Sequence, residues 1–216
     1  TILRIIAADS VEIKPDEIVY SVVPYNIISA GKLGTVEQSP LYFYLKDLGY
    51  KALGGITPIS TRLPSIIFGS LAIILIFLVS KELFRSKNIG LISAFMFAVS
   101  GYALRYNYEM DMSAYFFALL SAFFFIKALR ENQKNFYFCA LFLALAVLIK
   151  NITLIFGIVF AIVWMYSIYN KVKRNKEINS KRLLLKKEVK TILICSLIFF
   201  IAIIPVFSYN YLQYCK

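Results

Sequence analysis

Histidine is absent from the 216-residue sequence, and the twelve acidic residues are outnumbered by twenty-four Lys and Arg. Because histidine is the most common proton acceptor in enzyme sites, a base in this chain would have to be another group, and a carboxylate is the natural choice. Charged residues make up only 17% of the chain, whereas hydrophobic residues make up 60%. This composition excludes an ordinary soluble domain and predicts an all-α polytopic membrane protein.

Cysteine is also scarce, and the three present are Cys139, Cys195 and Cys215. They lie in or beside apolar segments without the spacing of metal ligands, and an odd number gives no disulfide framework. The net charge of +12 does not indicate a nucleic-acid partner, because the basic residues form short runs between apolar segments. That pattern is typical of a membrane topology signal.

Long apolar runs fill the chain from residue 63 onward. The first, Leu63 to Ser80, has eighteen residues without a charge, close to the roughly 20 that cross a hydrocarbon core. Residues 63–216 are therefore predicted to form a membrane domain of about six transmembrane helices, and residues 1–8 to be the tail of a preceding helix that is missing. The spans are expected near 63–84, 89–105, 112–130, 136–149, 152–169 and 191–209.

Residues 1–62 are predicted to form an extracytosolic loop with two membrane-parallel helices. From Glu17 to Ser29 the apolar residues recur at helical spacing around a proline, which predicts a kinked interfacial helix. Ser39 followed by Pro40 is a typical helix start, and two glycines at 54–55 are expected to end the second helix. Its polar face is expected to carry Lys46, opposite a row of leucines.

The basic residues also predict the orientation of the chain. Fifteen of them fall in three alternate connections, at 81–87, 127–134 and 171–190, together with only four acids. The positive-inside rule places these connections in the cytosol. The first loop, the turn at 105–111 and Lys150 are then expected outside, so all candidate carboxylates share one face.

Several short motifs carry a family resemblance. They are Pro15-Asp16-Glu17, Gln38-Ser39-Pro40-Leu41-Tyr42, Arg62-Leu63-Pro64-Ser65 and Tyr106-Asn107-Tyr108-Glu109-Met110-Asp111. In order and spacing the chain resembles the C-type glycosyltransferases, and within them the dolichyl-phosphate-mannose protein mannosyltransferase and lipid A aminoarabinose transferase group. Gln38-Ser39-Pro40 departs from that group, which often has His-Pro-Pro at this place. A second expected departure is that no soluble domain follows the spans.

The resemblance implies an inverting enzyme that moves a sugar from a polyprenyl-phosphate donor to a hydroxyl of a protein or lipid acceptor. We expect it in the plasma membrane of a prokaryote rather than in the endoplasmic reticulum, with membrane lipids around it and the active site outside. The chain is expected to be the N-terminal catalytic half, completed by a C-terminal half or a partner subunit. A transporter or flippase, or a catalytically silent scaffold, stays open as an alternative.

The candidate catalytic residues are Asp16, Glu17 and Asp111. Asp16 matches the first acid of the family's Asp-Glu motif and is predicted to be the base, although an Asp at this position could simply cap a helix. Glu109 and Asp111 are two residues apart and would diverge by about 200° on a helix, so only one is expected to be essential. Asp111 fits the family position better, and Glu109 is assigned to substrate binding.

Cations at the same face are candidates to bind the donor phosphate. Arg62, Arg105 and Lys150 are predicted for this role, although basic residues at a bilayer surface also attract lipid headgroups. Lys150 divides two apolar runs and has no acidic neighbour in the sequence, and charges inside membranes usually have a function. Tyr42 is predicted to contact the substrate. No cofactor is assigned, although carboxylates could hold Mg²⁺ or Mn²⁺ through oxygen.

Overall fold

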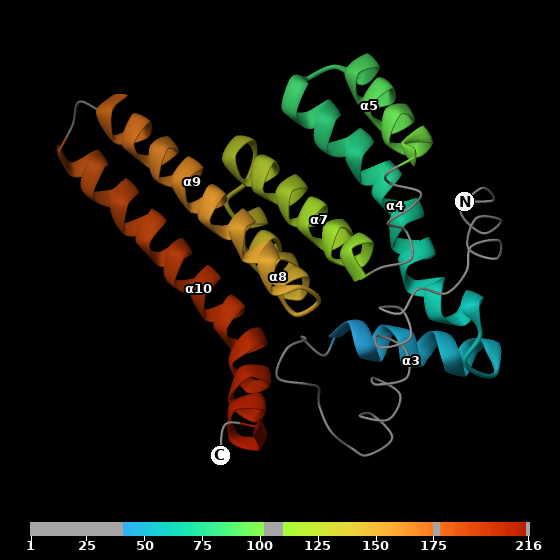
Figure 1. Cartoon of the computed structure of the whole chain (residues 1–216). Coiled ribbons are helices and arrows are strands. Elements are labelled where there is room, and N and C mark those ends of the chain that lie inside the picture. Colours follow the sequence, from blue (N-terminus) through green and yellow to red (C-terminus); the bar gives the residue numbers. More distant parts are fainter. Residues whose placement is uncertain (1–40, 102–109, 175–177, 215–216) are drawn as a thin grey trace.

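The computed structural model describes residues 41–101, 110–174 and 178–214, and these residues contain helices and no β-strand. The helices are α3 (Leu41–Leu53), α4 (Pro58–Phe84), α5 (Lys87–Val99), α7 (Met110–Arg130), α8 (Asn135–Val147), the 3₁₀ turn η2 (Asn151–Thr153), α9 (Leu154–Arg174) and α10 (Ile178–Tyr214). The main contacts between helices are those of α4 with α5 and α7, of α7 with α8, and of α8 with α10 (Figure 1). The all-α prediction is confirmed.

Four of the helices, α4, α7, α9 with its preceding η2 turn, and α10, are long and apolar enough to cross a membrane. The other two apolar helices, α5 and α8, have 13 residues each, which is about 20 Å of helix and less than a hydrocarbon core of roughly 30 Å. The protein is therefore a multi-pass membrane protein, and the number of six spans stays a prediction.

Helix α4 begins at Pro58, five residues before the first uncharged run. Thr57 caps it: its side-chain oxygen accepts from the Ser60 amide at 3.1 Å, while the Thr57 amide donates to the Ser60 hydroxyl at 2.7 Å. Such a reciprocal cap, followed by proline at the first helical position, is a strong start signal. The early start draws Arg62 into the second turn of the helix.

Helix α3 lies across the ends of the other helices (Figure 1). The Leu41 amide donates to the Leu148 carbonyl at 3.2 Å, which ties the start of α3 to the end of α8. At Gly49 the helix approaches α4 so closely that a Cβ would lie 2.8 Å from the Ser60 carbonyl oxygen. The helix predicted after Ser39 and Pro40 is thus observed as α3, and its position in the membrane interface stays a prediction. The other predicted helix of this loop, from Glu17 to Ser29, lies outside the described residues.

The expected polar face of α3 is wrong in one respect. Lys46 is buried, with 1% of its surface exposed, whereas Leu48 is 64% exposed. The reason is that α3 packs on α4 through the face that carries Tyr42, Lys46, Gly49 and Tyr50. The leucine row is divided, because Leu41 and Leu45 pack against the core and Leu48 points away from it.

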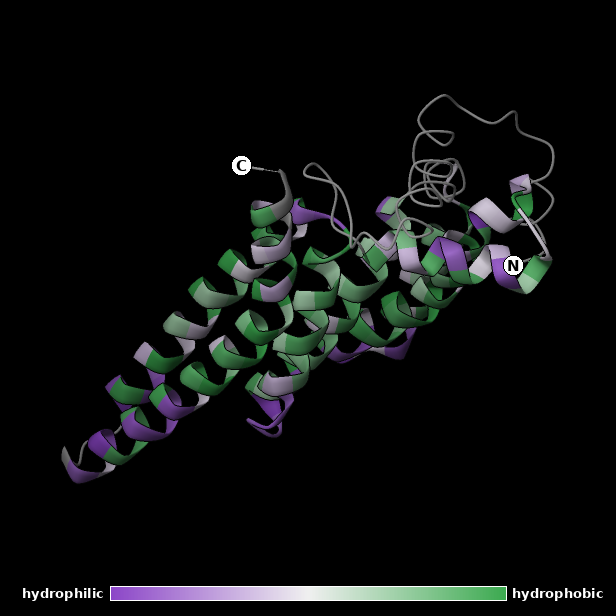
Figure 2. Ribbon diagram, turned by 90° about the horizontal axis from the view of Figure 1, so that it is seen from below, coloured by the Kyte–Doolittle hydropathy of each residue, from purple (hydrophilic) through white to green (hydrophobic). Residues whose placement is uncertain are grey.

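The two ends of the molecule differ in their content of basic residues. Hydrophobic residues cover the central parts of the helices, and hydrophilic residues gather toward the ends (Figure 2). One end carries α3, the start of α7 and the α8–α9 turn, and we call it the α3 end. The opposite end, here called the basic end, comprises residues 81–87, 127–134, 171–174 and 178–190.

This two-ended arrangement gives a topology prediction. In a variant without native cysteines, Lys51→Cys at the α3 end should react with an impermeant maleimide in intact cells, since the Lys51 side chain is 72% exposed. Lys173→Cys at the basic end should react only after permeabilisation, because the positive-inside rule holds basic loops in the cytosol. The reverse pattern would overturn the orientation.

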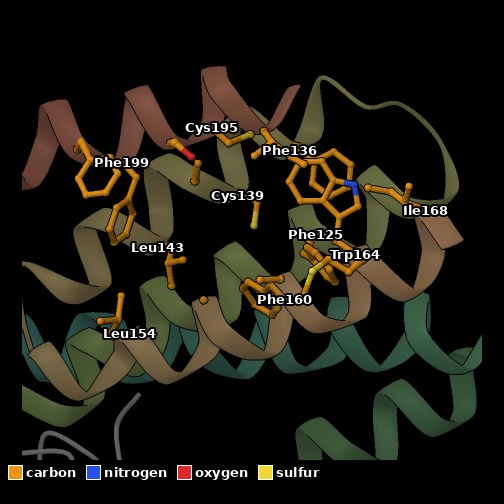
Figure 3. A pocket seen from close by; sticks show the side chains of 17 residues that line it. Phe125, Phe136, Cys139, Leu143, Leu154, Phe160, Trp164, Ile168, Cys195 and Phe199 are labelled. Carbon is orange, nitrogen blue, oxygen red and sulfur yellow. The ribbon is translucent and has the colours of Figure 1, made fainter. Parts of the chain in front are cut away.

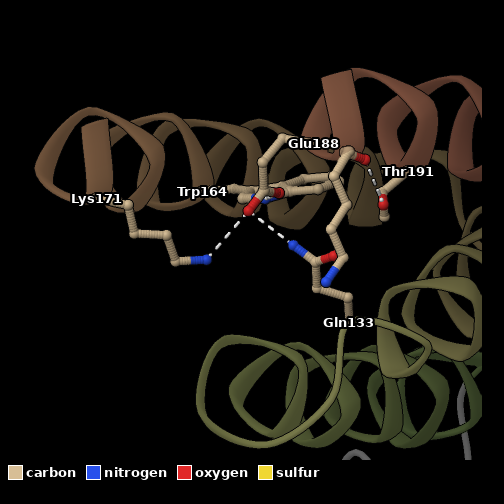
Figure 4. A network of polar contacts seen from close by, with 6 residues as sticks. Gln133, Trp164, Lys171, Glu188 and Thr191 are labelled. Carbon is tan, nitrogen blue, oxygen red and sulfur yellow. Dashed lines mark hydrogen bonds and ion pairs between the residues drawn. The ribbon is translucent and has the colours of Figure 1, made fainter. Parts of the chain in front are cut away.

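Helix α9 has no fully buried residue, and a polar network at the basic end attaches it to its neighbours (Figure 4). The Glu188 carboxylate of α10 accepts from Gln133 Nε2 at 2.7 Å, Trp164 Nε1 at 3.0 Å and Lys171 Nζ at 3.1 Å. Its side chain is 3% exposed. Three segments therefore meet at one buried carboxylate.

We expect Glu188→Ala to destabilise the protein by about 3 kcal/mol, the low end for breaking a buried pair, because Lys171 is 37% exposed and can be hydrated instead. An apparent melting temperature in detergent should fall by roughly 6–12 °C. Glu131→Ala is the matched control, since Glu131 is 53% exposed and its pair with Lys127 contributes less than about 1 kcal/mol. Equal shifts for both variants would contradict a structural role for Glu188.

Candidate site at the α3 end

Two of the predicted site residues, Asp111 and Lys150, come together at the α3 end. The Lys150 ammonium donates to Asp111 Oδ1, although 39 residues separate them. Both side chains are partly open, at 37% exposure for Lys150 and 39% for Asp111. Lys150 has no acidic residue near it in the sequence, but the fold gives it one. The start of α7, which carries Asp111, lies beside the end of α8.

Local structure fixes each partner of this ion pair. Asp111 lies in the first turn of α7, where a carboxylate is stabilised by the helix dipole. Lys150 has an extended backbone between α8 and η2. Its amide donates to the Ala146 carbonyl at 2.9 Å, and its carbonyl accepts from the Thr153 hydroxyl at 2.8 Å. The cation therefore projects from a hydrogen-bonded turn.

The pair lies next to a hydrophobic cluster formed by Tyr42, Phe43, Met110, Ala114 and Ile149. Met110 and Ile149 directly precede Asp111 and Lys150 in the chain. Packing of α3 against these two residues therefore sets the separation of the charged side chains. The cluster explains why α3 belongs to the site although its own charges are not part of the ion pair.

Tyr42 is 1% exposed, and its hydroxyl lies 3.4 Å from the Ser65 hydroxyl. The Lys46 ammonium lies 4.9 Å from the centre of its ring, in the range of a cation–π contact. The structure thus gives Tyr42 a packing role between α3 and α4, and its contact with a substrate stays a prediction.

Arg62 was expected at the mouth of the first span and is instead fully buried, with 0% exposure. The cap at Thr57 is the reason, because it starts α4 early and turns Arg62 into the protein. A guanidinium is buried only with polar partners, so Arg62 acts inside the fold rather than on the bilayer surface. Asp16, Glu17, Arg105 and Glu109 lie outside the described residues.

The family described as dolichyl-phosphate-mannose-protein mannosyltransferase matches residues 37–209, which include α3, the ion pair and most of α10. The chain belongs to this family. The resemblance to the C-type glycosyltransferases is therefore confirmed. No curated protein matches the chain.

The family assignment agrees with a solved structure, that of ArnT from Cupriavidus metallidurans in the apo state. The two chains are 16% identical and superpose with a TM-score of 0.67 over 99% of this chain and 40% of that one. At this identity the likeness shows the shared membrane fold. The chain spans about 40% of the length of the ArnT chain.

Two residues of this family member were missed by sequence reasoning. Lys46 is a buried amine next to Tyr42, and a polar position on an amphipathic helix gave no reason to expect it inside. Ser113 is buried two residues after Asp111, and its hydroxyl has no hydrogen-bond partner among the described residues. The sequence does not indicate that Ser113 is buried, because its burial depends on how α7 packs against its neighbours.

Helix α10 also reaches this end of the family fold. The pKa of the Tyr44 phenol of α3 is raised, first by burial and then by the nearby Tyr209 of α10 and Asp47.

Within the described ranges, no three acidic or cysteine side chains gather as a metal site would require. A site for Mg²⁺ or Mn²⁺ stays a prediction.

Proposed function

We propose that the chain transfers a sugar from a polyprenyl-phosphate donor to a hydroxyl of a protein or lipid glycan on the extracytosolic face. The observation that carries this proposal is the half-open Asp111–Lys150 pair at the α3 end of a chain that belongs to a mannosyltransferase family. The end that carries this pair is opposite the basic end, which supports an extracytosolic site. A prokaryotic plasma membrane is proposed as its location from the family resemblance.

Lys150 is proposed to hold the donor phosphate. When the sugar–phosphate bond breaks, negative charge grows on the lipid phosphate, and a positioned cation stabilises that charge. Its 37% exposure makes the Lys150 ammonium accessible to a headgroup, while Asp111 holds it in place before the donor arrives. From their positions in the motifs, Arg105 is proposed to help bind the phosphate and Glu109 to contact the substrate. Arg62, which is fully buried, is proposed to act indirectly, by supporting this end from within the protein.

Asp16 is proposed as the base that takes the proton from the acceptor hydroxyl, with Glu17 beside it. In an inverting single displacement the hydroxyl oxygen attacks the anomeric carbon, its proton passes to the carboxylate, and the lipid phosphate leaves with the bonding electrons. The lack of histidine supports a carboxylate in this role. No step requires a metal, although Mg²⁺ or Mn²⁺ could assist the phosphate.

A catalytically silent scaffold is the second candidate. Such a scaffold would keep the fold without needing the charge of Lys150. A flippase fits less well, since it would place charged residues near the middle of its spans.

The proposal is tested by a transfer assay in membranes that contain the full chain, with a radiolabelled polyprenyl-phosphate sugar and with or without EDTA. Product formation above that of membranes lacking the chain supports an enzyme, and its loss with EDTA would assign a metal. A normally inserted chain that gives no product with mannose or aminoarabinose donors would favour the scaffold.

A further inference from the structure

An apolar cavity of about 400 Å³ lies between α8, α9 and α10 and extends along α9 from Leu154 to Ile168 (Figure 3). Its walls include two stacked aromatic pairs, Phe136 with Trp164 at 4.0 Å and Phe125 with Phe160 at 4.5 Å between ring centres. The volume falls within the range of small-molecule sites, and the lining suits a hydrocarbon chain.

A second, basic pocket of about 580 Å³ lies at the basic end. Five cations line it against one acid, Glu131: they are Arg130, Lys134, Lys171, Lys187 and Lys190. It adjoins the apolar cavity along two segments, since Gln133 lies three residues before Phe136 and Thr191 directly precedes Ile192. The two spaces are therefore neighbours, and together they offer a polar and an apolar part to one amphipathic ligand; we call the pair the amphipathic site.

Glu188 and its partners lie at the junction of the two parts (Figure 4). Trp164 lines the apolar cavity and donates its indole N–H to Glu188, while Gln133 and Lys171 line the basic pocket and contact the same carboxylate. Gln133 Oε1 is buried and accepts no hydrogen bond from any described residue. A buried acceptor of this kind is rare and fits a ligand that brings a hydroxyl donor.

We propose that this amphipathic site binds an anionic phospholipid, with the phosphate in the basic pocket and an acyl chain in the apolar cavity. Basic pockets between transmembrane helices attract anionic headgroups, whereas a zwitterionic headgroup would place its own cation beside Lys134, Lys187 and Lys190. The lipid would fill the space beside α9, which has no fully buried residue of its own. The basic part of the site lies at the end opposite the proposed donor site, and a binding test by fluorescence does not depend on glycosyl transfer.

Trp164 is the single tryptophan of the chain and lines the cavity, so its fluorescence reports on an occupant. The full chain would be reconstituted in dioleoyl-phosphatidylcholine vesicles that contain increasing fractions of phosphatidylglycerol brominated on its acyl chains. We expect quenching that saturates at a low fraction and weakens as salt is raised. Brominated phosphatidylcholine should quench only in proportion to its abundance.

Lys187→Gln with Lys190→Gln should shift half-quenching to a roughly 10- to 30-fold higher fraction of brominated phosphatidylglycerol. Lys181→Gln with Lys186→Gln is the matched control, because it removes two charges from α10 outside both pockets and should leave the curve unchanged. In the cavity, Ala161→Phe should reduce maximal quenching, whereas Val163→Phe on the same helix, outside the lining, should not.

Three outcomes would overturn the proposal. Equal quenching by brominated phosphatidylglycerol and phosphatidylcholine at equal fractions would show that the site does not select charge. Equal curves for the two double variants would show that the basic pocket is not used. Full reversal of quenching by millimolar glycerol phosphate would show a site for free anions rather than for a lipid.

Discussion

Replacing Asp16 by Asn is expected to lower kcat for sugar transfer by about 10²- to 10⁴-fold, the usual contribution of a general base. Asn keeps the size and hydrogen-bonding shape of Asp but cannot take a proton from the acceptor hydroxyl. Donor binding should change little, because the phosphate is assigned to cations. The measurement is steady-state transfer from a polyprenyl-phosphate sugar with the variant at the same level in the membrane as the unchanged chain.

Glu17→Gln is the matched control for Asp16→Asn, because it makes the same chemical change one residue away. Adjacent residues on a helix point about 100° apart, so Glu17 should matter less to the proton transfer. A near-normal kcat for Asp16→Asn would remove Asp16 from the reaction. A product that retains the anomeric configuration of the donor would rule out the single displacement.

Lys150→Ala is expected to raise the KM for the donor by roughly 10- to 100-fold with normal protein levels. A hydrogen bond between charged groups contributes about 1.5–3 kcal/mol, which corresponds to a change of this size in affinity. The partly open Lys150 ammonium offers such a bond to a phosphate at the bilayer surface. The measurement is the initial transfer rate as a function of donor concentration.

Lys51→Ala serves as the control, since Lys51 is another lysine at the α3 end and pairs with Asp47 at 2.7 Å on the same helix. Its removal should leave the donor KM unchanged. A double variant, Lys150→Ala with Asp111→Asn, separates two roles of Lys150. Recovery of a normal KM would mean that Lys150 only neutralises Asp111, whereas a KM that stays high supports phosphate binding.

The long apolar runs correctly predicted an all-α membrane protein, because a membrane span leaves a strong signal in the sequence. Their ends were less predictable. The Thr57–Ser60 cap starts α4 at Pro58, and this local hydrogen bonding moved Arg62 from the expected surface into the interior. Hydropathy alone had placed Arg62 at the surface, and the hydrogen bonds of the cap explain why it lies inside the helix bundle instead.

The Asp111–Lys150 pair could not be derived from the sequence, although both residues were candidates. Their contact depends on how α7 and α8 align over 39 residues, and apolar runs do not determine the axial offset between neighbouring helices. Lys46 shows the same limitation, because the periodicity of α3 marks two faces but not which one packs on α4. The assignment of Asp16 as the base still rests on the motif, since Asp16 lies outside the described residues.

Photocrosslinking tests most directly whether the α3 end holds the lipid phosphate. A polyprenyl phosphate with a diazirine next to the phosphate would be irradiated with the full chain in membranes, and the labelled peptides mapped by mass spectrometry. The account predicts labelling at the start of α7 and in residues 148–153, removed by excess unlabelled polyprenyl phosphate. Labelling confined to residues 127–134 and 171–190 would contradict it.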